Sequence, residues 1–160
     1  MTICTKPLPM SSPEITAQLA TDLAPMLRAG DAVLLDGPVG AGKSHFARAL
    51  VLARLAEPED VPSPTFTLVQ SYGGGAAGGP EIWHCDLYRL NRPDEVLELG
   101  LDDAFESAIC LIEWPERLGD LTPKGALSIK FELTKSPQER LLTLSANTAR
   151  WAPVLDHFNG

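Results

Sequence analysis

Positive charge is scarce in this sequence. Lys and Arg number 13 against 21 Asp and Glu in 160 residues, so the formal net charge is −8 at pH 7. Proteins that bind nucleic acid directly owe much of their affinity to Lys and Arg side chains that neutralise phosphates. If RNA is involved, we therefore expect a partner protein to hold it.

Long apolar runs and closely spaced cysteines are also missing. Runs such as 108-AICLI-112 are far shorter than the roughly 20 residues that span a bilayer, and the opening MTICTKPLPMSSPE has no secretion signal. The cysteines at positions 4, 85 and 110 are spaced too irregularly for a disulfide framework or a metal knuckle. We therefore expect no membrane segment and a location in the reducing cytoplasm.

The length and the apolar content suit one folded domain. With 44% hydrophobic residues, the chain has enough apolar side chains to build a core. The sequence has no internal repeat and no linker that would separate two cores. We therefore expect a single domain over residues 1–160.

Apolar runs and helical periodicity alternate along the chain, which predicts an α/β fold. The run 32-AVLLD-36 is typical of a strand buried on both faces of a parallel sheet. The predicted helices cover 12–28 with an early end at Pro25, about 43–55, two short helices within 93–107 divided at Gly100, and 147–158. The other predicted strands cover 66–72, 81–88, 109–113, 126–133 and 140–146, with a loop at 57–65 and a Gly-rich hairpin tip at 73–80.

One segment carries a recognisable chemistry. Residues 37-GPVGAGKS-44 match the pattern G-x-x-x-x-G-K-[ST] between a predicted strand and a predicted helix. In such a loop the glycines let the backbone wrap round a phosphate, N–H groups face the anion, and the lysine reaches the β- and γ-phosphates. The expected nucleotide-binding residues here are Gly37, Pro38, Val39, Gly40, Ala41, Gly42, Lys43, Ser44 and His45. We expect a P-loop NTPase-like three-layer fold with a mixed, mostly parallel central sheet plus antiparallel hairpins.

Two acidic residues stand at the ends of predicted strands. Glu113 follows 109-ICLI-112, and Asp86 follows 82-IWHC-85. Ligands of doubly wound sheets bind beyond the carboxyl ends of the strands, and Mg²⁺ prefers hard oxygen ligands. Ser44 and Glu113 are therefore the candidate Mg²⁺ ligands, and Asp86 is the candidate for orienting the attacking water.

Three further residues are candidates for a role in nucleotide or metal binding. Thr65 precedes a predicted strand and could sense the γ-phosphate as switch threonines do, although a Ser/Thr-Pro turn explains it equally well. Trp114 directly follows Glu113, so it should lie near the nucleotide, where it covers the site or faces a partner. His84 lacks companion ligands at tetrahedral spacing, so zinc is not expected.

Taken together, the motifs resemble the TsaE family, small bacterial P-loop ATPases of tRNA threonylcarbamoyladenosine (t6A) synthesis. The similarity rests on 37-GPVGAGKS-44, 63-SPTFTLVQSY-72, 84-HCDLYRL-90 and 111-LIEWPERLG-119, and it covers about residues 12–145. It implies ATP and Mg²⁺ as cofactors and an ATPase, weak by itself, that docks on the TsaD–TsaB complex. That complex transfers a threonylcarbamoyl group to adenosine 37 of ANN-decoding tRNAs. By this resemblance the ATPase supports repeated cycles and contacts tRNA only indirectly.

The resemblance also assigns roles to single positions. Lys43 and Ser44 match the P-loop lysine and the metal-binding hydroxyl, Glu113 matches the metal-coordinating glutamate, and Asp86 matches the essential acid of the H-x-D-L-Y-R-L motif. The sequence departs from the family pattern where His45 follows Ser44, because Thr-Thr is usual there. That change should keep metal binding but alter its strength.

Three more assignments follow from the same resemblance. Thr65 matches the switch-like threonine, and Trp114 matches the tryptophan of the E-W-P motif. Thr16 stands where family members place a residue near the adenine. The Gly-rich 73–80 insert is a second departure, and it lengthens a hairpin.

Two other functions stay open on the sequence. A P-loop small-molecule kinase usually carries an Arg-rich lid, and residues 93–120 offer only Arg117 among many acids. A nucleotide-binding adaptor would need the P-loop but not the carboxylates.

Residues 81–120 hold three basic and eleven acidic residues, which form either a solvated helix face or a docking face for a basic partner. Arg140, in the more positive C-terminal segment, either lies near the adenine or only balances charge.

Overall fold

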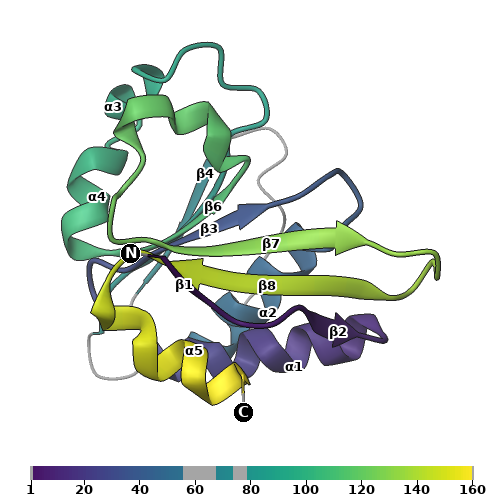
Figure 1. Cartoon of the computed structure of the whole chain (residues 1–160). Coiled ribbons are helices and arrows are strands. Elements are labelled where there is room, and N and C mark those ends of the chain that lie inside the picture. The colour runs from purple at the N-terminus through teal and green to yellow at the C-terminus, as the bar shows by residue number, and fades with distance from the viewer. Residues whose placement is uncertain (1, 56–67, 74–78, 160) are drawn as a thin grey trace.

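An eight-stranded sheet forms the middle of the fold (Figure 1). The computed structural model describes residues 2–55, 68–73 and 79–159. The strands in these ranges are β1 Ile3–Cys4, β2 Leu8–Met10, β3 Ala32–Asp36, β4 Val69–Tyr72, β5 Ile82–Asp86, β6 Ile109–Glu113, β7 Leu127–Leu133 and β8 Arg140–Ala146. The helices are α1 Pro13–Leu23, α2 Lys43–Arg54, α3 Glu95–Glu98, α4 Leu101–Ser107 and α5 Ala152–Asn159, with 3-10 turns η1 Ala24–Met26, η2 Pro115–Leu121 and η3 Ala149–Trp151.

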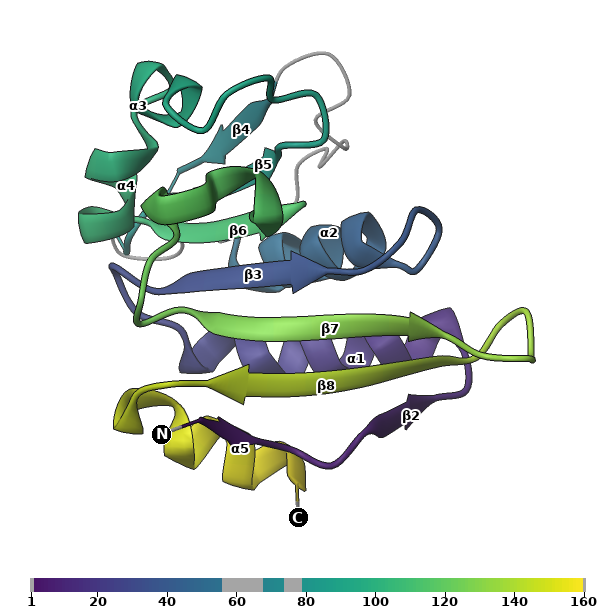
Figure 2. The same cartoon turned by 45° about the horizontal axis from the view of Figure 1, so that its top comes forward.

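The strand order is β1-β8-β7-β3-β6-β5-β4, and β2 also pairs with β8. Strands β7, β3, β6 and β5 run parallel to one another in the centre of the sheet. The flanking pairs β4–β5 and β7–β8 are antiparallel, as are β1 and β2 against β8 (Figure 2). The predicted mixed sheet is confirmed, and the carboxyl ends of β3, β5 and β6 meet at one edge.

Helices cover both faces of this sheet. Figures 1 and 2 show α1, α2 and α5 on one face and α3, α4 and η2 on the other. The side chains of β3 alternate between the two cores: Val33 and Leu35 pack on the first side, and Ala32 and Leu34 pack on the second. A strand covered on both faces needs apolar residues at every position, which explains the unbroken run in β3. The predicted three-layer arrangement is confirmed.

The helix boundaries follow local sequence signals. Ser12 caps α1, since its hydroxyl accepts a hydrogen bond from Ile15 N at 3.3 Å, and Pro13 is the first helical residue. The helix ends at Leu23 and continues as the 3-10 turn η1, because Pro25 lacks the N–H that an α-helix needs. Gly100, with φ of 80°, divides α3 from α4 as predicted.

Several features were not predicted. Strands β1 and β2 are only two and three residues long, and Pro9 stands exposed in the middle of β2, as proline does in edge strands. The predicted helix over 147–158 begins as the 3-10 turn η3 and becomes α-helical at Ala152. Among the described residues, no helix has the length and apolar content to cross a membrane. The predicted 57–65 loop, Thr65, the start of the 66–72 strand and residues 74–78 of the hairpin tip lie outside the described residues.

Candidate nucleotide site

The loop between β3 and α2 has the backbone that a phosphate cradle requires. Gly40 and Gly42 have φ of 82° and 99°, in the left-handed region that glycine adopts without strain. Gly42 is the N-cap of α2, which begins at Lys43. The first N–H groups of a helix have no partner within it, and they carry the positive end of its dipole. This turn is therefore suited to bind an anion.

Gly37 has a packing role that the motif does not state. A Cβ added there would lie 2.6 Å from the carbonyl oxygen of Phe131 on β7. We expect Gly37→Ala to lower the free energy of unfolding by about 1–3 kcal/mol, because the loop or β7 must shift. Urea denaturation measures this loss. Gly125→Ala is the control, since its Cβ would approach no atom closer than Thr148 Cγ2 at 4.0 Å, and equal losses in the two variants would contradict the packing role.

Lys43 is a buried cation at the centre of the loop. Its side chain is 4% exposed, and its ammonium donates a hydrogen bond to the Gly37 carbonyl at 2.6 Å. The same Nζ lies 3.4 Å from the centroid of the Trp114 ring, a cation–π contact. Burial lowers the pKa of Lys43, an effect that nearby carboxylates, Glu113 first among them, partly reverse. The ammonium is thus poorly solvated and favours an incoming anion.

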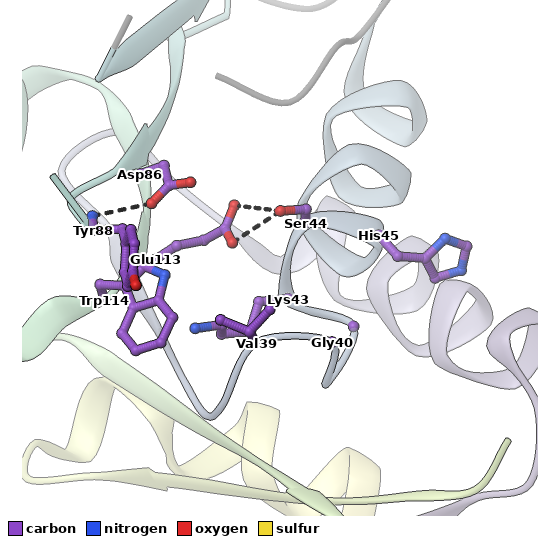
Figure 3. Close-up of a pocket in the computed structure, with 10 residues that line it drawn as sticks. Val39, Gly40, Lys43, Ser44, His45, Asp86, Tyr88, Glu113 and Trp114 are labelled. Carbon is purple, nitrogen blue, oxygen red and sulfur yellow. Dashed lines mark hydrogen bonds between the residues drawn. The ribbon is translucent and has the colours of Figure 1, made fainter. Parts of the chain in front are cut away.

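The two strand-end acids lie side by side, as their positions predicted. Asp86 and Glu113 are paired residues at the ends of β5 and β6. Glu113 is 3% exposed, and each of its carboxylate oxygens lies 2.9 Å from Ser44 Oγ on α2 (Figure 3). Asp86 accepts a hydrogen bond from Tyr88 N at 3.1 Å. Burial raises the pKa of Asp86, and the hydrogen bond from Tyr88 N partly offsets this rise.

Trp114 covers the phosphate end of the site. It is the only non-glycine residue with positive φ in the described part of the chain, at 60°. That backbone turn carries the indole over Lys43, and the Tyr88 ring packs against it with centroids 4.9 Å apart. Such a conformation is unfavourable for a bulky residue and is typical of functional positions.

Two cavities meet at the P-loop. The first, of about 490 Å³, contains the acids and Lys43, and it is lined by Val39, Gly40, Gly42, Lys43, Ser44, His45, Asp86, Tyr88, Glu113 and Trp114. The second, of about 310 Å³, is lined by Pro13, Thr16, Gly40, Ala41, Gly42, His45, Pro137, Gln138 and Arg140. The P-loop residues Gly40 and Gly42, together with His45, line both. The charged side chains of Lys43, Asp86 and Glu113 thus lie on one side of the P-loop, and Arg140 lies on the other.

Thr16 and Arg140 lie together in the second cavity. Thr16 is 3% exposed, and its hydroxyl donates to the Ser12 carbonyl at 3.4 Å. Arg140 donates to the Gly40 carbonyl at 3.1 Å, which ties the β7–β8 hairpin to the P-loop. The role near the adenine that the family resemblance gave Thr16 stays a prediction.

Other predicted residues lie further from the acids. Gly37 and Pro38 line a separate cavity beside Trp114 and β7. His45 points away from Asp86 and Glu113 in Figure 3, and its Nε2 is 3.0 Å from the Pro13 carbonyl oxygen. Thr65 lies outside the described residues, so its predicted role stays a prediction.

Sequence reasoning gave no task at this site to two residues that the structure brings there. His84 is buried and contacts Glu113, and Tyr88 lines the first cavity. The signal was available in the two-residue period of a strand, because residues 84 and 86 of β5 point to the same face.

The residues present fit a magnesium ion. Ser44 and Glu113 offer hard oxygen atoms close together, beside a loop built for phosphates. No group of three or more His, Cys, Asp or Glu side chains that could hold a metal by itself occurs among the described residues. Mg²⁺ is usually held by one or two protein ligands, with waters and substrate phosphates as the remaining ligands.

Comparison with known proteins shows the family of this chain. The family profile described as "Threonylcarbamoyl adenosine biosynthesis protein TsaE" matches residues 10–142. A Rickettsia conorii protein named tRNA threonylcarbamoyladenosine biosynthesis protein TsaE is 37% identical over 138 residues, which are 86% of this chain and 77% of that protein. A protein of the same name from Mycobacterium bovis is 35% identical over 138 residues, 82% of each chain.

The fold has a counterpart among solved structures. The crystal structure of Bacillus subtilis YdiB matches this chain with a TM-score of 0.81 and 26% sequence identity. The match covers 99% of this chain and 95% of YdiB. With the family profile and the relatives above, it follows that the chain belongs to the TsaE family of tRNA threonylcarbamoyladenosine biosynthesis proteins.

Proposed function

We propose that the chain binds ATP with Mg²⁺ and hydrolyses it, as an ATP-driven switch in t6A biosynthesis. The observation that carries this proposal is a single cavity that holds the P-loop lysine, the Ser44–Glu113 pair and Asp86. Binding alone would need only the loop, whereas the paired acids add the means to hold a metal ion and orient water. Membership of the TsaE family supports the pathway.

Each side chain then has one task. The Lys43 ammonium and the first N–H groups of α2 bind the phosphates. Ser44 and Glu113 hold Mg²⁺, which when bound neutralises charge on the phosphates. Asp86 accepts a hydrogen bond from the attacking water and orients it toward the γ-phosphate. Thr65 is the proposed sensor of the γ-phosphate.

The nucleoside end of ATP is proposed to occupy the second cavity. Arg140 and Gln138 bring polar groups to it from the β7–β8 hairpin, and Thr16 brings a hydroxyl from α1. This places the adenine beyond Gly40–Gly42 and the phosphates over Lys43.

TsaD and TsaB are the proposed partners, and tRNA is contacted only through them. The net charge of −8 supports an indirect contact, since direct phosphate binding requires clustered Lys and Arg. A switch of this kind turns over ATP slowly until a partner completes or orders its site.

We expect the TsaD–TsaB complex with tRNA to raise the ATPase rate of this chain at least about tenfold, which corresponds to about 1.4 kcal/mol of the barrier. The measurement is phosphate release by the pure chain, by the partners without it, and by the mixture. Partner-independent turnover with phosphorylation of an added metabolite would favour the kinase alternative instead.

In a gel shift at physiological salt, tRNA should not bind the chain alone. Tight binding of tRNA would contradict the proposed indirect contact.

A further inference from the structure

His84 has a contact that the proposed mechanism leaves without a task. It lies in β5 two residues before Asp86, and its side chain is 1% exposed. Its Nε2 is 2.6 Å from Glu113 Oε2, across the β5–β6 pair. The imidazole is therefore in direct contact with the carboxylate proposed to bind the metal.

Packing alone does not explain a histidine here. A carboxylate only accepts hydrogen bonds, so Nε2 carries the hydrogen that is shared with Glu113. The other ring nitrogen, Nδ1, is buried and has no hydrogen-bond partner among the described residues. Burying an unpaired polar atom is unfavourable, and an apolar side chain would avoid it. The bond to Glu113 is thus the contact that favours a histidine at this position.

Ser44 and His84 act differently on the orientation of the Glu113 carboxylate. Ser44 Oγ is 2.9 Å from both carboxylate oxygens, so its hydroxyl does not select between them. His84 contacts Oε2 and thereby fixes the rotation of the carboxylate about its last bond. Oε2 thus has two donors within hydrogen-bond distance, His84 and Ser44, whereas Oε1 has Ser44 alone and keeps more of its acceptor capacity for a metal ion.

We propose that His84 is a positioning residue, which holds the Glu113 carboxylate in the orientation that binds a divalent metal together with Ser44. The inference rests on the proposed function, because it assumes a metal–nucleotide complex at the P-loop. Groups that orient a metal ligand in this way are worth about 10–100-fold in metal affinity. Loss of His84 should therefore weaken metal binding and leave metal-free nucleotide binding intact.

The test compares nucleotide affinity with and without metal. Calorimetry gives the dissociation constant of a non-hydrolysable ATP analogue in EDTA and in Mn²⁺. The ratio of the EDTA value to the Mn²⁺ value is the factor by which the metal strengthens binding, and it reports metal binding without turnover. The variants are His84→Leu, His84→Asn and His84→Gln. The glutamine amide nitrogen can reach the place of Nε2 and donate to Glu113, whereas the shorter asparagine amide corresponds to Nδ1 and cannot.

We expect His84→Leu and His84→Asn to lower the ratio by about 10–100-fold and His84→Gln to restore it to within about threefold of the wild type. Binding in EDTA should stay within about twofold in all four proteins, and this also checks folding. An unchanged ratio in His84→Leu, or a glutamine variant as weak as the asparagine one, would overturn the positioning role. Absence of analogue binding by the wild type would instead overturn the proposed function.

Discussion

Replacing Lys43 with alanine is expected to weaken ATP binding by about 30-fold or more. Truncating one member of a buried charge pair costs about 2–5 kcal/mol, and each 1.4 kcal/mol is a tenfold change in affinity. Lys43 is 4% exposed, and its ammonium donates a hydrogen bond to the loop carbonyl of Gly37, so its charge lies within the loop itself. Calorimetric titration with the non-hydrolysable ATP analogue measures the loss.

Lys124→Ala is the matched control for this variant. Lys124 is exposed and lines a separate cavity near the start of β7. The same unit of positive charge is removed, but affinity should stay within about twofold, because exposed charges are screened by water and salt. If the two alanine variants bind ATP equally well, the phosphates do not lie at Lys43 and the proposed site is wrong.

Local patterns were sufficient to predict most elements of the fold. The apolar runs of β3 and β6, the Ser12–Pro13 start of α1 and the division at Gly100 are all written in short stretches of sequence. Strands β1 and β2 were missed because they form through distant pairing, such as Ile3 with Ala146 in β8. The parallel pairing of β7 with β3 was missed for the same reason.

The site divides in a similar way. The neighbouring positions of Asp86 and Glu113 followed from the rule that parallel strands end at one edge of the sheet. The contact of Trp114 with Lys43 did not, because it depends on a positive φ at a tryptophan, which no sequence pattern announces. The bond between His84 and Glu113 depends on side-chain direction across two strands.

The acidic residues of 81–120 lie in different parts of the structure. Of these acids, Asp86 and Glu113 line the first cavity. Asp102 and Asp103 are exposed on α4, which covers the other face of the sheet from α2. The net charge therefore combines acids of the site with exposed acids on α4, which are available both to solvent and to a basic partner. At the proposed phosphate site, Lys43 and the α2 N-terminus supply local positive potential, which would let an acidic protein hold a polyanion.

Replacing Asp86 with alanine is expected to remove turnover and spare binding. Its hydrogen bond is with Tyr88 N, whereas the Lys43 ammonium and the Ser44 hydroxyl are the groups proposed to bind phosphate and metal, and the variant leaves both in place. Loss of a group that orients or deprotonates the attacking water costs about 10²–10⁴-fold in rate. Affinity for ATP should stay within about threefold, because removing a negative charge beside the phosphates does not weaken their binding. The ATPase rate is measured with TsaD–TsaB present, and the affinity by calorimetry.

Asp86→Asn separates chemistry from local structure in the same experiment. The amide oxygen can still accept the hydrogen bond from Tyr88 N, so the turn after β5 is kept, but the charge that draws a proton from water is lost. We expect the asparagine variant to be as slow as the alanine variant, and Asp120→Ala, which removes an exposed acid, to match the wild type. Burial raises the pKa of Asp86, so turnover by the wild type should fall on acidification at a higher pH than an ordinary aspartate would give. Wild-type rates in either Asp86 variant would exclude Asp86 from the water-activating step.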